Sequence, residues 1–238
     1  MRVEAFRVVS NGFEIDGRVH LPAHCPAAGV ICSHGLFSSK DSPKFIAMAR
    51  HLAEQGLVAI RYDHRGCGDS QGRFADTTLS SRLDDLQAVY AFVSRQSAWV
   101  EGHMGFMGSS MGGLVSLWAM ATGCNIRAAV AWATPWQISK PSKNSAAGLK
   151  VLGEAFFKDL RQYRLDRILG DLRGCMIVHG RDDKLVPVTH AYRIYQRLAT
   201  PRCLRILHGA DHRFSNPLHR KRAIRYTTAF LRQNLMDV

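Results

Sequence analysis

Short apolar runs alternate with stretches of helical periodicity along this 238-residue chain, and this alternation restricts the fold more than any other feature. The runs typical of strands are 29–33, 57–62, 103–107, 126–132, 175–179 and 203–208. Helical spacing fills the intervals at 43–55, 79–93, 111–121 and 189–198, and again at 216–235. Strands separated by helices predict a largely parallel sheet covered on both faces. We therefore expect one α/β domain over residues 1–238.

The amino-terminal segment predicts an antiparallel hairpin that brings the sheet to about eight strands. Residues 4–9 alternate in polarity, Asn11-Gly12 is a turn signal, and 13–21 resumes an extended pattern. The functional loops of a parallel sheet gather at the carboxyl ends of its strands. Residues that directly follow an expected strand are therefore the first place to look for chemistry.

Residues 108–112 read GSSMG, a G-x-S-x-G pattern between an expected strand and an expected helix. This setting makes Ser110 a candidate nucleophile, because a sharp strand-to-helix turn presents the hydroxyl and small neighbours tolerate the crowded backbone. The amino terminus of the following helix also leaves backbone N–H groups free to bind an oxyanion. The same pattern occurs in ordinary glycine-rich turns, so the assignment depends on partners elsewhere in the chain.

A serine nucleophile requires a base, and the base requires an orienting carboxylate. The expected strand 175–179 is followed by a loop with two adjacent carboxylates, Asp182 and Asp183. The expected strand 203–208 is followed by GADHRF, which contains His212. The order serine, aspartate, histidine is the one found in hydrolases built on this kind of sheet. At this point both aspartates are candidates.

Four blocks in the same order resemble the pattern of the α/β-hydrolase superfamily. They are SHGL at 33–36, GSSMG at 108–112, HGRDDKLVP at 179–187 and GADH at 209–212. The resemblance spans nearly the whole chain. It implies an α/β-hydrolase fold with a mostly parallel central sheet.

The resemblance also implies roles for individual residues. Ser110 matches the nucleophile and His212 matches the general base. The acid is the fifth position of the H-G-x-x-D-x-x-V-P loop, which is Asp183, and Asp182 is then a neighbouring loop carboxylate. The backbone N–H groups of Leu36 and Met111 would form the oxyanion hole.

The block YDHRGCGDSQG at 62–72 is similar to a loop of cinnamoyl and feruloyl esterases and related small acyl esterases. This similarity implies ester substrates and structural support near the pocket. Residues 137–174 contain no clear strand, and their position predicts a short lid. The aromatic residues expected at the pocket wall are Phe37, Trp136, Phe156 and Phe214.

These features together predict a serine esterase that cleaves small acyl or aryl esters through an acyl-enzyme intermediate. Such chemistry needs no cofactor, and no spacing typical of metal ligands occurs, so a metal site is not expected. Thioesterase activity, on acyl-CoA or other thioesters, is the nearest alternative, because the same groups accept a thioester. A peptidase and a non-catalytic binding module on a hydrolase scaffold are weaker alternatives.

Composition limits the partners and the location. The formal net charge is +13, but the basic residues are dispersed, with one short run at 220–222, so we expect no nucleic-acid partner. Six scattered cysteines without a C-x-x-C pair predict reduced thiols. No stretch reads as a secretory signal or a membrane span. We expect a cytoplasmic protein that acts on a small-molecule ester and has no membrane partner, and a homodimer stays open.

Overall fold

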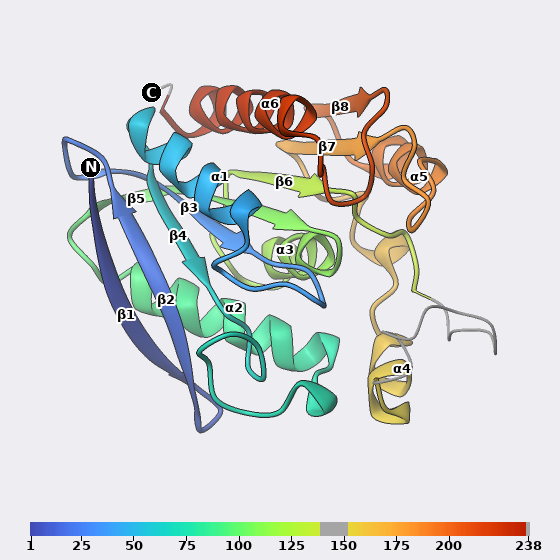
Figure 1. Ribbon diagram of the computed structural model, residues 1–238, viewed down its shortest axis with the longest axis horizontal. Helices are drawn as coiled ribbons and strands as arrows, with labels where there is room; N and C mark the ends of the chain where they lie inside the picture. Colours follow the sequence, from blue (N-terminus) through green and yellow to red (C-terminus); the bar gives the residue numbers. More distant parts are fainter. Residues whose placement is uncertain (139–151, 237–238) are drawn as a thin grey trace.

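The structure is a computed structural model that describes residues 1–138 and 152–236 (Figure 1). Its centre is an eight-stranded sheet in the order β1-β2-β4-β3-β5-β6-β7-β8. The strands are β1 Arg2–Ser10, β2 Phe13–Leu21, β3 Ala27–Ser33, β4 Val58–Tyr62, β5 Trp99–Ser109, β6 Ala128–Trp132, β7 Cys175–Gly180 and β8 Arg202–Leu207. β1 and β2 are antiparallel, β2 is antiparallel to β4, and the pairs from β4 to β8 are parallel. The expected mostly parallel sheet of about eight strands is confirmed.

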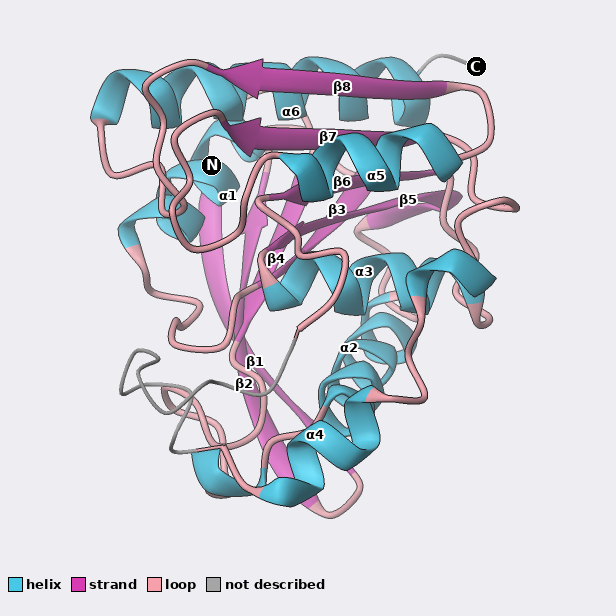
Figure 2. Cartoon of the chain, turned by 90° about the vertical axis from the view of Figure 1, so that its right-hand side faces the viewer, coloured by secondary structure: helices cyan, strands magenta, loops and turns pink. Residues whose placement is uncertain are grey.

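Helices cover both faces of this sheet, as Figures 1 and 2 show. They are α1 Pro43–Glu54, α2 Leu79–Val93, α3 Met111–Ala121, α4 Glu154–Leu160, α5 Thr189–Arg197 and α6 Pro217–Met236, with short 3-10 helices at Phe74–Asp76 and Leu165–Arg167. α1 and α6 pack on one face, and α2, α3 and α5 pack on the other. Adjacent residues of β3 show the alternation, because Val30 joins the core under α1 and α6 while Ile31 joins the core under α2 and α3.

The amino-terminal hairpin forms as expected. Its strands pair in register from Arg2 opposite Leu21 to Ser10 opposite Phe13. Asn11 and Gly12 have φ of 46° and 82°. Two successive positive φ angles are typical of the two-residue hairpin turn whose twist matches the flanking strands.

The largest difference from the sequence-based bounds lies at the start of β5. β5 begins at Trp99 rather than at residue 103, and its pairing with β3 shifts register between Ala27 and Gly29. Gly102, with φ of 73°, lies in this irregular part, which interrupts the apolar pattern.

The expected lid, 137–174, is described in part, because residues 139–151 lie outside the described residues. The described part includes α4, which packs beside the start of α2. The Ser80 backbone N–H donates to Asp159 Oδ2 at 3.0 Å, and the Ser80 and Tyr163 hydroxyls lie 2.7 Å apart. The role of this insertion as a lid stays a prediction. Within residues 1–138 and 152–236, none of the helices has the length and apolarity required to cross a membrane.

Candidate active site

The turn between β5 and α3 holds Ser110 in a strained conformation with φ of 56° and ψ of −120°. A positive φ is unfavourable for a residue with a side chain, and such strain persists only where the surroundings enforce it. Two glycines allow the crowding. A β-carbon on Gly108 would lie 2.1 Å from the Gly112 carbonyl oxygen, and one on Gly112 would lie 2.0 Å from the Ser33 carbonyl oxygen. The G-x-S-x-G pattern is therefore required by close backbone approach.

Ser110, His212 and Asp183 form one continuous hydrogen-bonded chain. The Ser110 Oγ lies 3.2 Å from His212 Nε2, and His212 Nδ1 lies 2.8 Å from Asp183 Oδ2. A carboxylate can only accept, so Nδ1 carries the proton and Nε2 presents its lone pair to the hydroxyl. Asp182 is exposed, whereas Asp183 is buried. The structure thus brings Asp183, rather than Asp182, to the histidine.

Further donors surround Asp183. Its Oδ1 accepts the backbone N–H groups of Leu185 and Val186 at 2.9 and 2.8 Å. His179 Nε2 lies 3.2 Å from its Oδ2 and 2.9 Å from the Val186 carbonyl oxygen. Burial alone would raise the pKa of Asp183, but the hydrogen bonds from His179, His212 and Val186 hold this pKa well below its usual value. Asp183 is therefore ionised at neutral pH. The contacts of His179 are therefore with residues of the loop that directly follows it.

The loop after β3 lies against the nucleophile. A β-carbon on Gly35 would come within 3.3 Å of Ser110 Cβ and 3.2 Å of the Ser109 carbonyl oxygen. The backbone N–H groups of Leu36 and Met111 make no hydrogen bond to any residue within the described ranges. Both groups are candidates for binding an oxyanion beside Ser110, as the sequence predicts.

The 62–72 block folds around a buried lysine. Lys40 Nζ lies 2.7 Å from Asp63 Oδ2, 2.6 Å from Asp69 Oδ2 and 3.1 Å from Asp16 Oδ1. Burial alone would lower the pKa of Lys40, but these carboxylates raise it above its usual value. The block is structural support for the loops at this end of the sheet. This cluster was not predicted from the sequence, because no local feature of the sequence indicates that Lys40 is buried.

Lys44 is a second cation that the sequence analysis missed. Its Nζ donates to Ser109 Oγ at 2.7 Å, directly before the candidate nucleophile. Loss of solvation, followed by repulsion from Arg213 and Arg220, lowers the pKa of Lys44 to about 8, although Asp211 opposes the shift. The amino end of α1 therefore contributes a cation whose charge changes near neutral pH.

Among the ring contacts of the described residues, none joins two of the four aromatic residues expected at the pocket wall. Phe37 is 53% exposed and packs on Phe74, with 5.2 Å between the ring centroids. Trp136 is half-buried, and two arginine guanidinium groups cover its ring. Phe214 is fully buried against Trp132 in the core under α1 and α6. Phe214 is therefore a core residue, and its expected place in the pocket wall is wrong.

Phe156 is also buried, on α4. Its ring packs edge-on against Phe157, with 5.1 Å between centroids, in the core under α2 and α3. Phe156 and Phe157 are the buried residues of α4, so this side of the helix packs against the core. Its contact with a substrate stays a prediction.

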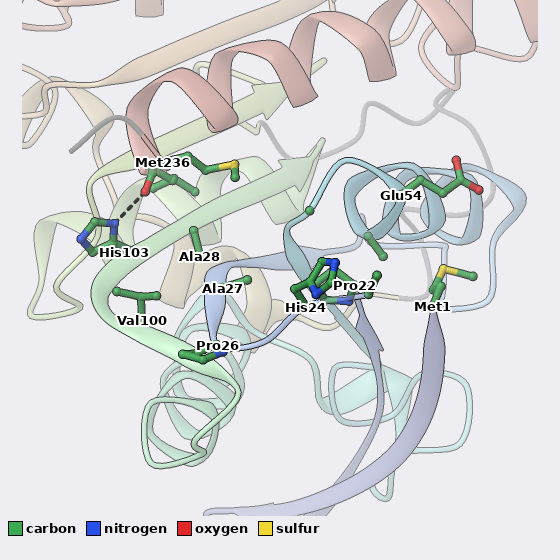
Figure 3. Close-up of a pocket in the computed structure, with 14 residues that line it drawn as sticks. Met1, Pro22, His24, Pro26, Ala27, Ala28, Glu54, Val100, His103 and Met236 are labelled. Carbon is green, nitrogen blue, oxygen red and sulfur yellow. Dashed lines mark hydrogen bonds between the residues drawn. The ribbon is translucent and has the colours of Figure 1, made fainter.

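A cavity of about 680 Å³ lies far from this site. Figure 3 shows it between the start of β3, at Ala27 and Ala28, and the ends of α1 and α6, at Glu54 and Met236. It lies at the amino ends of the parallel strands, whereas Ser110, Asp183 and His212 follow their carboxyl ends. Because ligands of open α/β sheets bind at the carboxyl ends, we do not assign this cavity to the reaction.

Comparison with known proteins gives two curated relatives of low identity. The uncharacterized protein YqkD of Bacillus subtilis (strain 168) is 23% identical over 235 residues, which cover 90% of this chain and 74% of YqkD. The mitochondrial palmitoyl-protein thioesterase ABHD10 of Mus musculus is 23% identical over 197 residues, which cover 73% of this chain and 64% of ABHD10. The chain thus spans slightly less than two thirds of the mouse protein.

Solved structures show the same fold. Est1E of Butyrivibrio proteoclasticus, in a structure with bound ferulic acid, superposes with a TM-score of 0.85 at 20% identity, covering 98% of this chain and all of that one. This likeness confirms the α/β-hydrolase fold. The model of the family described as serine aminopeptidase, S33 (Hydrolase_4) matches residues 24–165, which are more than half of the chain. The chain therefore belongs to this family of α/β-hydrolases.

Proposed function

We propose that this hydrolase cleaves small carboxylic esters through an acyl-enzyme intermediate. The observation that carries the proposal is the continuous chain from the Asp183 carboxylate through His212 to the Ser110 hydroxyl, at a strained turn beside two unpaired N–H groups. A weak nucleophile, its base and an orienting acid in this order are the requirements of acyl transfer.

In the acylation step, His212 Nε2 takes the Ser110 proton while Oγ bonds to the ester carbonyl carbon. The carbonyl electron pair moves to oxygen, and the Leu36 and Met111 N–H groups donate to the resulting oxyanion. The oxyanion then collapses, the bond to the alcohol oxygen breaks, and the His212 imidazolium gives its proton to that oxygen. The alcohol leaves, and Ser110 carries the acyl group.

In the deacylation step, water replaces serine as the nucleophile. His212 takes a proton from water, hydroxide bonds to the acyl carbon, and collapse of the second oxyanion returns the proton to Ser110 Oγ. Asp183 keeps the proton of His212 on Nδ1 and stabilises the imidazolium in both steps. The low pKa of Asp183 keeps it ionised throughout.

Replacement of Ser110 tests the proposal. We expect Ser110→Ala to abolish turnover of p-nitrophenyl esters and labelling by a fluorophosphonate, because within residues 1–138 and 152–236 only the Ser110 hydroxyl hydrogen-bonds to His212. Ser116→Ala is the matched control, since Ser116 is buried in the following helix and its hydroxyl has no partner among the described residues. Folded Ser110→Ala with ester turnover near that of the wild type would contradict the assignment.

Two observations favour thioesters as a second substrate class. A relative is named a palmitoyl-protein thioesterase, and Lys44, Arg213 and Arg220 gather beside the His212 loop. These cations would attract a phosphate-bearing thioester such as acyl-CoA. The test compares kcat/KM for acyl-CoA, simple esters and amino-acid p-nitroanilides at low and high salt. A salt effect confined to acyl-CoA supports the thioesterase, and turnover of the anilides alone would support a peptidase.

A further inference from the structure

Arg82 is a buried cation beneath the loop that follows β3. It lies on the apolar face of α2, three residues after Leu79 and four before Leu86. Its side chain is fully buried, with 0% exposed. Asp85, three residues further along the helix, forms its ion pair with Arg65 at 2.7 Å. Among the described residues, Arg82 has no ion-pair partner. Burial of a guanidinium without one is costly, so its other contacts must compensate for the lost solvation.

Those contacts include Cys67 Sγ, which accepts from Nη2 at 3.4 Å, and three successive carbonyl groups. Arg82 Nη1 donates to the His34 and Gly35 carbonyl oxygens at 3.5 and 3.4 Å, and Nη2 donates to the Leu36 carbonyl oxygen at 3.4 Å. These distances are long for hydrogen bonds, so the attraction is chiefly that of a cation for carbonyl dipoles. Thr77 Oγ1 holds the guanidinium from the other side, accepting from Nε at 3.0 Å.

The Gly35 carbonyl oxygen has a second donor. His34 Nδ1 donates to it at 2.7 Å, while His34 Nε2 accepts the His64 backbone N–H at 3.1 Å. Burial, followed by His64 and Arg82, lowers the pKa of His34 well below its usual value. His34 is thus neutral, with its proton on Nδ1. Two donors fix the direction of one carbonyl group.

The direction of this carbonyl determines the direction of an N–H. The Gly35–Leu36 peptide is trans, and in a planar trans peptide the carbonyl and the following N–H point in opposite directions. When Arg82 and His34 hold the Gly35 oxygen, they therefore turn the Leu36 N–H away from themselves. The same loop lies against Ser110, since a β-carbon on Gly35 would come within 3.3 Å of Ser110 Cβ.

We propose that Arg82 is a positioning residue that fixes the Gly35–Leu36 peptide, so that the Leu36 N–H is ready for the oxyanion before the reaction begins. The inference rests on the proposed ester hydrolysis. Preorganised donors stabilise charge that develops in the transition state at no cost of reorientation. The buried positive charge of Arg82 also stabilises the negative charge that develops on the oxyanion. Arg82 touches no reacting atom and acts through the loop.

The experiment compares Arg82→Met, which removes the charge, with Arg82→Lys, which keeps the charge but cannot reach three carbonyls with a planar fork. We expect kcat on a p-nitrophenyl ester to fall about 100-fold and about 10-fold respectively, the scale of a lost oxyanion donor. KM should stay within about threefold, because the contact is made in the transition state.

A thionoester of the same acid provides a readout that a purely structural role would not change. Sulfur accepts hydrogen bonds weakly, so a well-formed oxyanion hole favours the ester over the thionoester. We expect this ester preference to fall in both Arg82 variants in parallel with kcat. Arg61→Met is the matched control, because Arg61 is also buried and donates to Lys40 and Asp41, later in the same loop, but not to the carbonyl groups of residues 34–36. It should keep the preference.

The outcomes are distinct. If wild-type protein neither cleaves esters nor reacts with a fluorophosphonate, the proposed function fails and this inference fails with it. If the wild type is active and a folded Arg82 variant keeps kcat and ester preference within twofold, only the inference is overturned. If neither Arg82 variant folds, Thr77→Val decides, since it removes only the Nε acceptor. A reduced ester preference then supports the inference, and an unchanged one overturns it.

Discussion

Asp183 and Asp182 are adjacent carboxylates with different surroundings. Asp183 accepts from His212, His179 and two backbone N–H groups, whereas Asp182 is exposed. The two side chains differ in burial although they belong to consecutive residues of the loop after β7. Substitution of Asp182 can therefore serve as the control for substitution of Asp183 in a test of the proposed mechanism.

We expect Asp183→Asn to lower kcat by about 10⁴, because an amide in place of the carboxylate favours the wrong tautomer of His212 and cannot stabilise its imidazolium. Steady-state kinetics on a p-nitrophenyl ester measure the effect. Asp182→Asn is the matched control and should leave kcat within about twofold. Equal losses in the two variants would refute the assignment of the acid.

At the scale of elements, the site depends on how closely β3, β5 and α3 approach. Gly112 lies at the start of α3, where its backbone touches the end of β3. A larger residue would push helix and strand apart. Gly112 is therefore needed for the close packing of α3 on β3 as well as for the turn that presents Ser110.

We expect Gly112→Ala to lower the free energy of unfolding by about 2–4 kcal/mol, because its β-carbon would lie 2.0 Å from the Ser33 carbonyl oxygen. Chemical denaturation measures the change. Gly170→Ala is the control, since a β-carbon there has no atom within 4 Å and the backbone needs no positive φ. A Gly112→Ala protein as stable as the control would show that the elements move apart easily.

At the scale of the whole molecule, three buried histidines are neutral within the fold. Burial is the largest cause in each, and it lowers the pKa of His20 and of His64 to about 4 and that of His34 well below its usual value. The unfolded chain takes up protons at these histidines below about pH 6.5, whereas the folded chain does not until about pH 4 or lower. Stability therefore decreases as the pH falls through this window.

We expect the free energy of unfolding to fall by about 3 kcal/mol between pH 7 and pH 4 from His64 alone, with His20 and His34 adding in the same direction. Urea denaturation at several pH values measures the slope. His64→Gln should reduce this slope, because one proton-binding group is then missing from the unfolded chain. A stability that is constant from pH 7 to pH 4 would contradict the assigned charge states.

The sequence by itself determined the succession of strands and helices along the chain. It also identified Ser110, Asp183 and His212 as candidates for the nucleophile, the acid and the base. Periodicity, turn signals and the position of a residue after a strand are local properties, so they can be read from neighbouring residues. The main errors in element boundaries also have local causes, such as the irregular start of β5 around Gly102.

Tertiary structure decided which groups face one another. The carboxylate that meets His212, the place of Phe214 in the core and the contact of Arg82 with the 34–36 loop all join segments that are distant in the chain. Arg82 did leave a signal, as a charged residue on the apolar face of α2. The helical spacing of Arg82 between Leu79 and Leu86 is a signal of burial that was not used, and only the packing of α2 under the loop supplied its carbonyl partners. Burial can be read from periodicity, whereas a partner depends on the path of the whole chain.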